Sequence, residues 1–345
     1  MMRRLGVLTL LIAISLVSSA RADEGVYAFD SLTSSVNARA LGMGNAFSSI
    51  GSDASAPFWN PAGISRVRWI SISSTYSDLF GGFREGLVKH SFLAYSQRVE
   101  ELGGTIGVCW LRVGVEDIPI TGEEFIDVNG NGRLGDFQDK NGNGIKDPGE
   151  PYIDRPVISG SFDSYDDAVF ISYALPLTGS LGAGISLKLL RQRVFENTGS
   201  GWGIDVGFRY TPWRSEGRVR GEASVAFVLR DLGTHIRWDT PSRASFSRPL
   251  SLTLGISTKL GIGYVSLLAA ADYRSDEREI WTGAELTILR ALSLRAGLYR
   301  GRPTFGAGFR IPIYRSTLSL DYAFTTHEDL GRTQIVAADF ELWAR

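Results

Sequence analysis

The sequence predicts an all-β protein: a closed antiparallel transmembrane β-barrel of 14 strands. Apolar residues make up 43% of the 345-residue chain. Beyond residue 22, however, they form no run of about 20 that would cross a membrane as a helix. They alternate with polar or small residues, which is the pattern of strands that turn one face toward lipid. An even number of such segments suits a barrel closed by a single chain.

Each strand is predicted from this alternation. Between residues 201 and 211, for example, Trp202 and Phe208 share one face, whereas Asp205 and Arg209 share the other. Most segments have the roughly 9 to 13 residues that a tilted strand needs to cross a bilayer. The predicted strands are residues 69–78, 87–98, 103–113, 167–175, 180–195, 201–211, 218–230, 249–260, 264–274, 279–289, 291–300, 303–313, 317–326 and 333–343.

The connections between these strands alternate in length. If the barrel begins in the periplasm, the three longest connections, 79–86, 114–166 and 231–248, all lie on the extracellular side. Membrane barrels have short periplasmic turns and longer outer loops. A soluble β-sandwich also alternates apolar and polar residues, but it has no reason to sort its loops in this way. The membrane barrel is therefore the preferred interpretation.

The first 22 residues are typical of a secretory signal peptide. Arg3 and Arg4 precede an apolar core at 5–18, and a small-x-small cleavage site ends at Ala22. A retained membrane anchor is the alternative, but the apolar run is too short for a transmembrane helix. We expect cleavage after Ala22 and, together with the strands, a location in the outer membrane in contact with its lipid.

Residues 23–66 precede the first strand and are predicted to form a small N-terminal plug in the barrel lumen. The stretch 37–65 is too apolar for a solvated tail and too irregular for a strand. Glycine permits close backbone approach or positive φ, and Pro61 restricts both itself and Asn60. The candidate plug or gating residues are Arg39, Gly42, Gly44, Phe47, Asp53, Asn60 and Pro61.

The same stretch resembles a known N-terminal signature. The pattern A-R-x-x-G-M-G-x-A-F, followed by D-A-S-A and N-P-A-G, is met at residues 38–47, 53–56 and 60–63. It is similar to the start of FadL-type and PorV/PorQ-type outer-membrane barrels of Gram-negative bacteria. In the later strands the likeness is only one of strand number and length. The resemblance implies a barrel that begins with an inserted plug.

The resemblance leaves more than one function open. A PorV/PorQ-like barrel would act in protein secretion or surface export, with secretion components or exported proteins as partners. A FadL-like channel would instead admit long-chain fatty acids or other hydrophobic small molecules by movement of the plug. A structural or adhesive surface barrel is the third possibility. Apart from 114–166 and 231–248, the outer loops are short, and this favours the PorV/PorQ interpretation.

An acidic insertion interrupts the strand series. Residues 116–167 contain thirteen Asp or Glu and four Lys or Arg. Within them, residues 139–150 match the spacing of an EF-hand-like calcium loop, with a glycine at its sixth position. The candidate ligands are the side chains of Asp139, Asn141, Asn143, Asp147 and Glu150 and the backbone carbonyl of Ile145.

A less regular first copy precedes this loop, which is the second copy, and has Asp127, Asn129, Asn131 and Asp136 as candidate ligands. Asp136 lies one residue beyond the position that the loop pattern requires, and Asp139 or Asp154 would complete the ligands of this copy. Oxygen ligands without His or Cys favour Ca²⁺ over zinc or copper. We expect weak binding and a structural role, with an acidic solvated loop as the alternative.

The residues for covalent catalysis are sparse. The three histidines, at 90, 235 and 327, are scattered, and Cys109 is the single cysteine. No G-x-S-x-G motif accompanies them, so we predict no catalytic residue and no enzymatic activity. The glycine-rich runs do not open predicted helices, and neither a nucleotide nor a nucleic acid is expected as a partner.

Overall fold

The computed structural model describes residues 32, 34–79, 88–128, 130, 132, 135–147, 150–327 and 331–343. The predicted signal peptide, Asn129 and Asn131 lie outside the described residues. The elements are α2 (Ala38–Gly42), α3 (Ala56–Trp59), η2 (Pro61–Arg66), β1 (Ile70–Leu79), β2 (Val88–Val99), β3 (Gly104–Ile126), β4 (Arg155–Pro176), β5 (Leu181–Val194), β6 (Asn197–Glu216), β7 (Val219–Trp238), β8 (Ser245–Ser247), β9 (Ser251–Ile262), β10 (Val265–Arg274), β11 (Glu279–Ile288), β12 (Leu292–Tyr299), β13 (Arg302–Ile313), β14 (Ser316–His327) and β15 (Gly331–Leu342).

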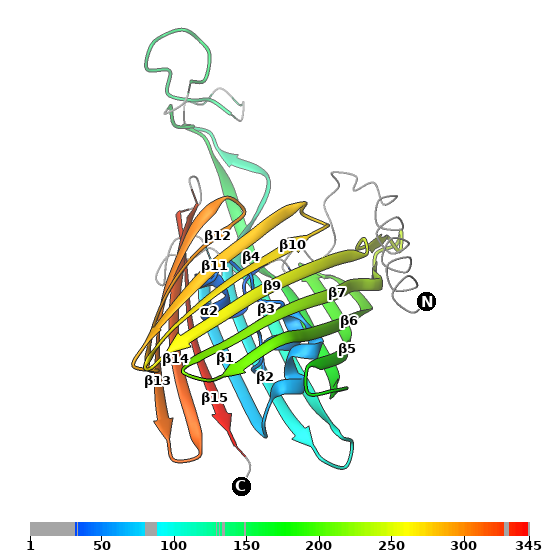
Figure 1. Ribbon diagram of the computed structural model, residues 1–345. Coiled ribbons are helices and arrows are strands. Elements are labelled where there is room, and N and C mark those ends of the chain that lie inside the picture. The colour runs from blue at the N-terminus through cyan, green and yellow to red at the C-terminus, as the bar shows by residue number, and fades with distance from the viewer. Residues whose placement is uncertain are drawn as a thin grey trace. The chain divides into compact units, whose positions relative to one another are not determined.

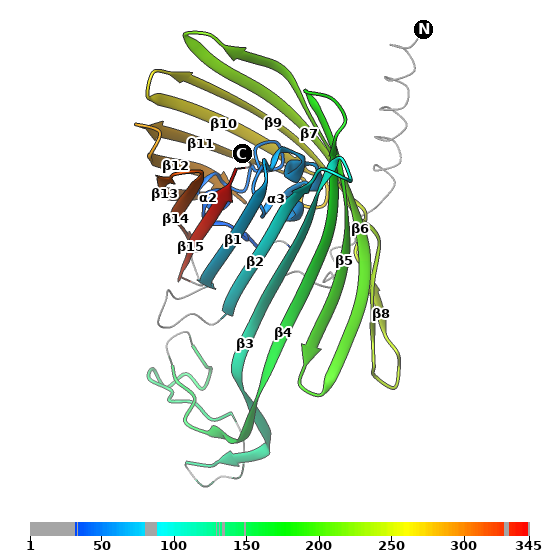
Figure 2. The same ribbon diagram turned by 90° about the horizontal axis from the view of Figure 1, so that it is seen from below.

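Fourteen of these strands form one closed antiparallel barrel, as predicted. Neighbours in sequence pair with each other, β1 also pairs with β15, and the pairing of β6 with β7 completes the ring. The short strand β8 pairs only with one end of β7 and is not part of the ring. Figures 1 and 2 show the strands running around a common lumen. None of the described helices has the length and apolar character needed to cross a bilayer.

The alternation of the sequence corresponds to the two faces of the wall. On β6, the side chains of Trp202 and Phe208 are 45% and 40% exposed on the outside, whereas Asp205 and Arg209 are 3% and 6% exposed. Other strands repeat this arrangement with outward Leu, Ile, Val and aromatic side chains. An apolar outer face over a polar inner face is the reverse of a soluble barrel and suits a lipid environment.

The two ends of the barrel differ in their connections. Residues 100–103, 177–180, 217–218, 263–264, 289–291 and 314–315 connect strands at one end, which we call the turn end. Residues 80–87, 127–154, 195–196, 239–250, 275–278, 300–301 and 328–330 connect strands at the other, the loop end. The longest connections therefore share one end, as the sequence predicted.

Four strands are longer than predicted. β3 and β4 continue through much of the stretch assigned to the loop 114–166, and Val115–Ser164 forms a compact unit separate from the barrel. β6 and β7 likewise extend into the stretches assigned to their loops. Charged residues interrupt the apolar alternation in these extensions, so lipid-facing periodicity could not reveal them. In these extensions, the backbone hydrogen bonds between paired strands hold the β structure.

The centre of the barrel is occupied by residues 34–67, which we call the N-terminal segment. Figure 2 shows α2 and α3 inside the ring of strands. Most of this segment is buried, including Phe47, Phe58 and Trp59. These side chains form one apolar cluster with inward residues of several strands. The core of this barrel is thus the contact between the N-terminal segment and the inner wall.

Candidate functional site

The N-terminal segment is shaped locally by two asparagines. The Asn37 side-chain oxygen accepts a hydrogen bond from the backbone N–H of Arg39 and begins α2. The Asn60 side-chain oxygen accepts from the N–H of Ala62 and begins η2, with Pro61 at its first position. Asparagine is a favoured helix N-cap because it satisfies an otherwise unpaired N–H, and proline has no such N–H to lose. These caps allow very short helices to form within the lumen.

A buried ionic network fastens α2 to the wall. Arg39 Nε lies 2.8 Å from Glu285 Oε2 on β11, and Arg295 Nε of β12 lies 2.6 Å from the same oxygen. Arg295 Nη1 also lies 2.6 Å from Asp321 Oδ1 on β14. Burial by itself lowers the pKa of Arg39, but the Glu285 carboxylate outweighs it and raises that pKa above its usual value. Arg39 therefore remains a cation inside the lumen.

Polar side chains of the wall also hold the backbone of the N-terminal segment. Asp272 Oδ2 accepts hydrogen bonds from the N–H groups of Phe47 (3.0 Å) and Ser48 (2.8 Å). Arg230 donates to the carbonyls of Phe58 and Trp59. Backbone groups in an irregular segment need such partners when they are buried.

Two further contacts extend this pattern. Arg209 Nη1 donates to the Gly51 carbonyl at 3.1 Å. Asn60 Nδ2 donates to the carbonyls of Ser48 at 3.0 Å and Phe208 at 3.2 Å. Inward-facing groups of the wall thus form hydrogen bonds with the backbone of the N-terminal segment.

Glycines set the distance between segment and wall. Gly44 has a φ of +60°, and a Cβ there would lie 2.3 Å from the Thr282 carbonyl oxygen. On β11, a Cβ at Gly283 would lie 2.2 Å from the Met43 carbonyl oxygen. Real side chains do not tolerate such distances, so both positions require glycine for the backbones to meet.

An aromatic cluster fills the lumen beside this contact. The ring of Phe58 lies 5.0 Å from that of Trp59, 5.8 Å from Phe170 on β4 and 6.5 Å from Phe92 on β2, between centroids. The rings meet edge to face, an arrangement favoured by their charge distribution. Phe47 joins the cluster at 5.8 Å from Trp59. The wall here presents aromatic side chains to the lumen.

The remaining predicted plug residues also lie in this segment. Asp53 accepts hydrogen bonds from the backbone and hydroxyl groups of Ser55 and is buried. Gly42 packs against β12 and β13, where a Cβ would lie 3.2 Å from Arg295 Cβ. Pro61 lies against Gly184 of β5, since a Cβ at Gly184 would lie 2.4 Å from the Pro61 carbonyl carbon.

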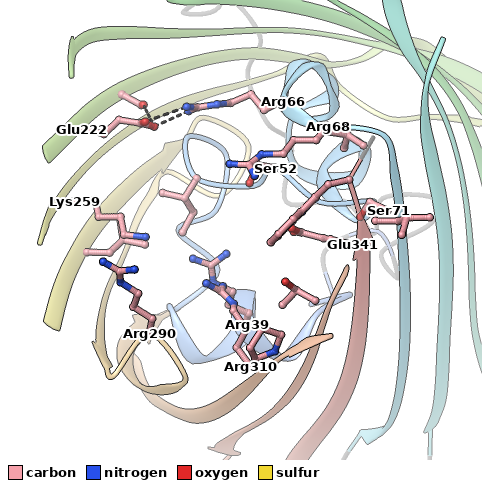
Figure 3. Close-up of a pocket in the computed structure, with 18 of the residues that line it drawn as sticks. Arg39, Ser52, Arg66, Arg68, Ser71, Glu222, Lys259, Arg290, Arg310 and Glu341 are labelled. Carbon is pink, nitrogen blue, oxygen red and sulfur yellow. Dashed lines mark hydrogen bonds and ion pairs between the residues drawn. The ribbon is translucent and has the colours of Figure 1, made fainter. Parts of the chain in front are cut away.

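A cavity of about 880 Å³ adjoins the N-terminal segment. Its lining reaches Leu289, Arg290 and Ala291 in a connection of the turn end. Seven basic side chains line it, with Glu222 and Glu341 as the acidic ones. Figure 3 labels all of these charged side chains except Arg209 around the cavity. The basic residues are Arg39, Arg66, Arg68, Arg209, Lys259, Arg290 and Arg310.

The acidic loop forms a compact turn around its carboxylates. Asp139 accepts hydrogen bonds from the N–H groups of Gly142 (2.6 Å) and Gly144 (2.7 Å). These backbone donors, Gly144 first, lower the pKa of Asp139 below its usual value of 3.8. Glu150 closes the loop by accepting from the N–H groups of Lys140 and Asp147.

The predicted ligands of the second copy are thus brought together. The amides of Asn141 and Asn143 both donate to Asp147 Oδ2, at 2.6 and 2.8 Å. The N–H of Ile145 donates to Asn143 Oδ1. Within the described ranges, no three His, Cys, Asp or Glu side chains are grouped to hold a metal.

The first copy is held differently. Asp127 accepts from the N–H groups of Gly130 and Gly132, both at 2.6 Å. Asp154 accepts from the N–H groups of Val128 (3.3 Å) and Asp136 (2.9 Å). Asp154 therefore connects both ends of this copy, although Asn129 and Asn131 lie outside the described residues.

Sequence reasoning missed the residues of the wall that hold the N-terminal segment. Glu285, Arg295, Asp272 and Arg230 belong to strands far from that segment in sequence. The available signal was the alternation of inward and outward positions along each strand, because all four residues occupy inward positions. This alternation assigns a residue to the lumen but does not identify its partner across the barrel.

No protein-family model matches this sequence, and no curated protein sequence matches it. Among solved structures, the chain is similar to the toluene transporter TbuX of Ralstonia pickettii, with 13% identity and a TM-score of 0.49 over 89% of this chain and 98% of that one. It is also similar to the toluene transporter TodX of P. putida, with 12% identity and a TM-score of 0.47 over 90% of this chain and 99% of that one. A Pseudomonas aeruginosa FadL homologue is similar with 10% identity and a TM-score of 0.43, over 89% of this chain and 98% of that one. These values describe a general likeness of the chain trace.

Proposed function

We propose that this protein is an outer-membrane channel for hydrophobic compounds, closed by its N-terminal segment. The observation that carries the proposal is the aromatic inner wall at Phe92 and Phe170, covered by Phe58 of the segment. Porin lumens are polar and filled with water. Withdrawal of the segment would instead open a passage lined by apolar rings, which suits a ligand that water solvates poorly. The N-terminal signature shared with FadL-type barrels supports the same function.

The orientation follows from the loops. We place the turn end in the periplasm and the loop end outside the cell, because outer-membrane barrels have longer external connections. The apolar outer face supports contact with lipid. Passage would then run from the loop end, past the aromatic cluster, toward the turn end.

Binding of a long-chain fatty acid tests this function. We expect saturable binding by the purified barrel and weaker binding by Phe170→Gln, because the substitution makes the inner wall polar. Ile171→Gln is the matched control, since Ile171 is the next residue of β4 and is 48% exposed on the outer face. Fluorescence titration with a fluorescent fatty acid measures both. Absence of saturable binding, or equal weakening by the two variants, would reject the channel.

A second candidate is a PorV/PorQ-like accessory barrel in protein secretion or surface export. The observation that favours it is the fastening of the segment by buried ion pairs at Glu285, which suits a barrel that stays closed. Deletion of the gene would then deplete specific proteins from the cell surface, as measured by mass spectrometry of the surface fraction. An unchanged surface proteome argues against this role.

We also propose that residues 139–150 bind Ca²⁺ and that the ion stiffens the loop. The support is the convergence of Asp139, Asn141, Asn143, Asp147 and Glu150 around one turn. Only oxygen donors would face the ion, as Ca²⁺ prefers. When bound, the ion would neutralise the crowded carboxylates.

Calorimetric titration of the full chain in detergent tests the calcium proposal. We expect a dissociation constant on the order of 10⁻⁴ to 10⁻³ M, as in extracellular modules, and loss of binding in Glu150→Gln. Glu124→Gln, which removes an exposed carboxylate elsewhere in the same unit, should leave binding unchanged.

Since the pKa of Asp139 is lowered in the folded loop, the stability that this ionised group contributes is present above pH 3.8 and is lost as the pH falls through the lower value. No heat of binding at millimolar Ca²⁺ would contradict the proposal.

A further inference from the structure

The cationic cavity beside the N-terminal segment has more positive charge than its own carboxylates balance. Glu222 is already shared, because Arg66 Nη1 lies 2.5 Å, Arg209 Nη2 3.4 Å and Arg214 Nη2 2.9 Å from its oxygens. One carboxylate thus serves three guanidinium groups. It has no capacity left to neutralise the other cations of the cavity.

Four of those cations have no ion pair with any described residue: Arg68, which stacks on the ring of Trp343, Lys259 of β9, Arg290 of the 289–291 turn and Arg310 of β13. Lys259, Arg290 and Arg310 are exposed, and these three also line an adjoining cavity of about 370 Å³. Figure 3 shows Lys259 and Arg290 on the same side of the cavity. Glu341, the other lining carboxylate, likewise forms no ion pair within the described part of the chain.

We propose that this cavity is a binding site for a phosphoryl-bearing anion. Like charges held together in a recess repel one another, and a bound anion relieves that repulsion. Three cations match a ligand that carries two or more negative charges on several oxygens, whereas a single carboxylate would balance only one of them. Two of the three are arginines, whose planar fork binds phosphate oxygens bidentately.

The rest of the lining suits a ligand larger than a free ion. Ile50, Ile70, Leu268 and Leu342 contribute apolar surface between the charged groups. A volume of about 880 Å³ exceeds the need of one phosphate group. The anion therefore comes either from a soluble phosphate ester or from a phospholipid headgroup, and both share the phosphoryl chemistry that the cations recognise.

The proposal does not depend on what crosses the barrel. It concerns a cavity lined by charge, whereas the proposed channel concerns the aromatic wall. Failure of fatty-acid binding would leave the anion site intact, and absence of an anion site would leave the channel intact. The two are measured with different ligands.

Titration of the detergent-solubilised full chain with inorganic pyrophosphate tests the site. We expect saturable binding at fixed ionic strength and about a tenfold loss of affinity in Lys259→Gln or Arg310→Gln, because each removes a charge-assisted contact. Arg218→Gln is the matched control: it removes the same charge from an exposed turn at the turn end and does not line the cavity. It should retain the parent affinity.

Two results would overturn the proposal: no saturable binding, or an equal loss of affinity in Arg218→Gln, which would show that net charge alone attracts the anion. Nanodiscs distinguish the sources. If phosphatidylglycerol weakens pyrophosphate binding relative to phosphatidylcholine, the cavity holds an anionic lipid headgroup. Equal affinity in both lipids assigns the site to a soluble phosphate ester.

Discussion

Replacement of Glu285 by glutamine is expected to release the N-terminal segment from the barrel wall. This carboxylate is the shared partner of Arg39 and Arg295, and all three groups are largely buried. Removing one partner of a buried ion pair leaves an uncompensated charge and costs about 3–5 kcal/mol. Each 1.4 kcal/mol changes a population ratio about tenfold. The fraction of barrels with a displaced segment should therefore rise by two orders of magnitude or more.

Limited trypsin digestion measures this release, because Arg39 and Arg66 become accessible when the segment leaves the lumen. Planar-bilayer conductance should rise in parallel. Asp167→Asn is the control, since it breaks the exposed pair with Arg112, in which Nε lies 2.8 Å from Oδ1. Exposed pairs contribute about 0–1 kcal/mol. If Glu285→Gln digests and conducts no differently from Asp167→Asn, the ionic network does not hold the segment.

Introducing a side chain at Gly283 is expected to prevent the segment from seating at all. The Cβ of Gly283→Val would lie 2.2 Å from the Met43 carbonyl oxygen, which is backbone and has no alternative rotamer. Overpacking of a well-filled core costs about 1–3 kcal/mol, and a backbone clash costs more. The strand itself tolerates valine, which favours β structure. The barrel should therefore fold with an open lumen.

The expected result for Gly283→Val is a folded barrel with high, persistent conductance. Heat-modifiable migration on a gel reports whether the barrel has formed, independently of the segment. Gly179→Val serves as the control, because a Cβ there has no atom within 4 Å. A Gly283→Val barrel that is folded, closed and protected from trypsin would show that the close approach of α2 to β11 is not what seals the lumen.

Together these variants separate the two candidate functions. A channel gated by the segment should bind its hydrophobic ligand more readily when Glu285 is neutralised, because the aromatic wall at Phe92 and Phe170 is uncovered more often. An accessory barrel that works closed should instead lose its effect on surface proteins. Opposite outcomes are thus expected from one substitution.

The strand series was predictable because lipid imposes a simple rule. Each crossing strand must place apolar residues outward, so positions such as Trp202 and Phe208 alternate regularly with Asp205 and Arg209. This rule does not apply beyond the lipid. The extensions of β3 and β4 to residues 126 and 155 were therefore missed, although their strands were assigned correctly within the barrel.

The N-terminal signature and the calcium-loop spacing were visible as local patterns. Glycine and asparagine at fixed intervals have local geometric meaning, as at Gly44, with its positive φ, and Asn60, which caps η2. Their contacts were not visible. Arg39 reaches Glu285 across 246 positions of sequence, and nothing local to either residue specifies that pairing.

The sequence by itself determined the barrel, its strand number and the end that carries the long loops, since alternation and spacing follow from one-dimensional periodicity. Tertiary structure alone decided which residues of the wall hold the N-terminal segment in the lumen. Closing the ring brings inward residues of distant strands to a common space, where Glu285 pairs with two arginines while Lys259, Arg290 and Arg310 line one cavity without an ion pair to any described residue. Such contacts between distant strands depend on barrel curvature and register, which no short stretch of sequence encodes.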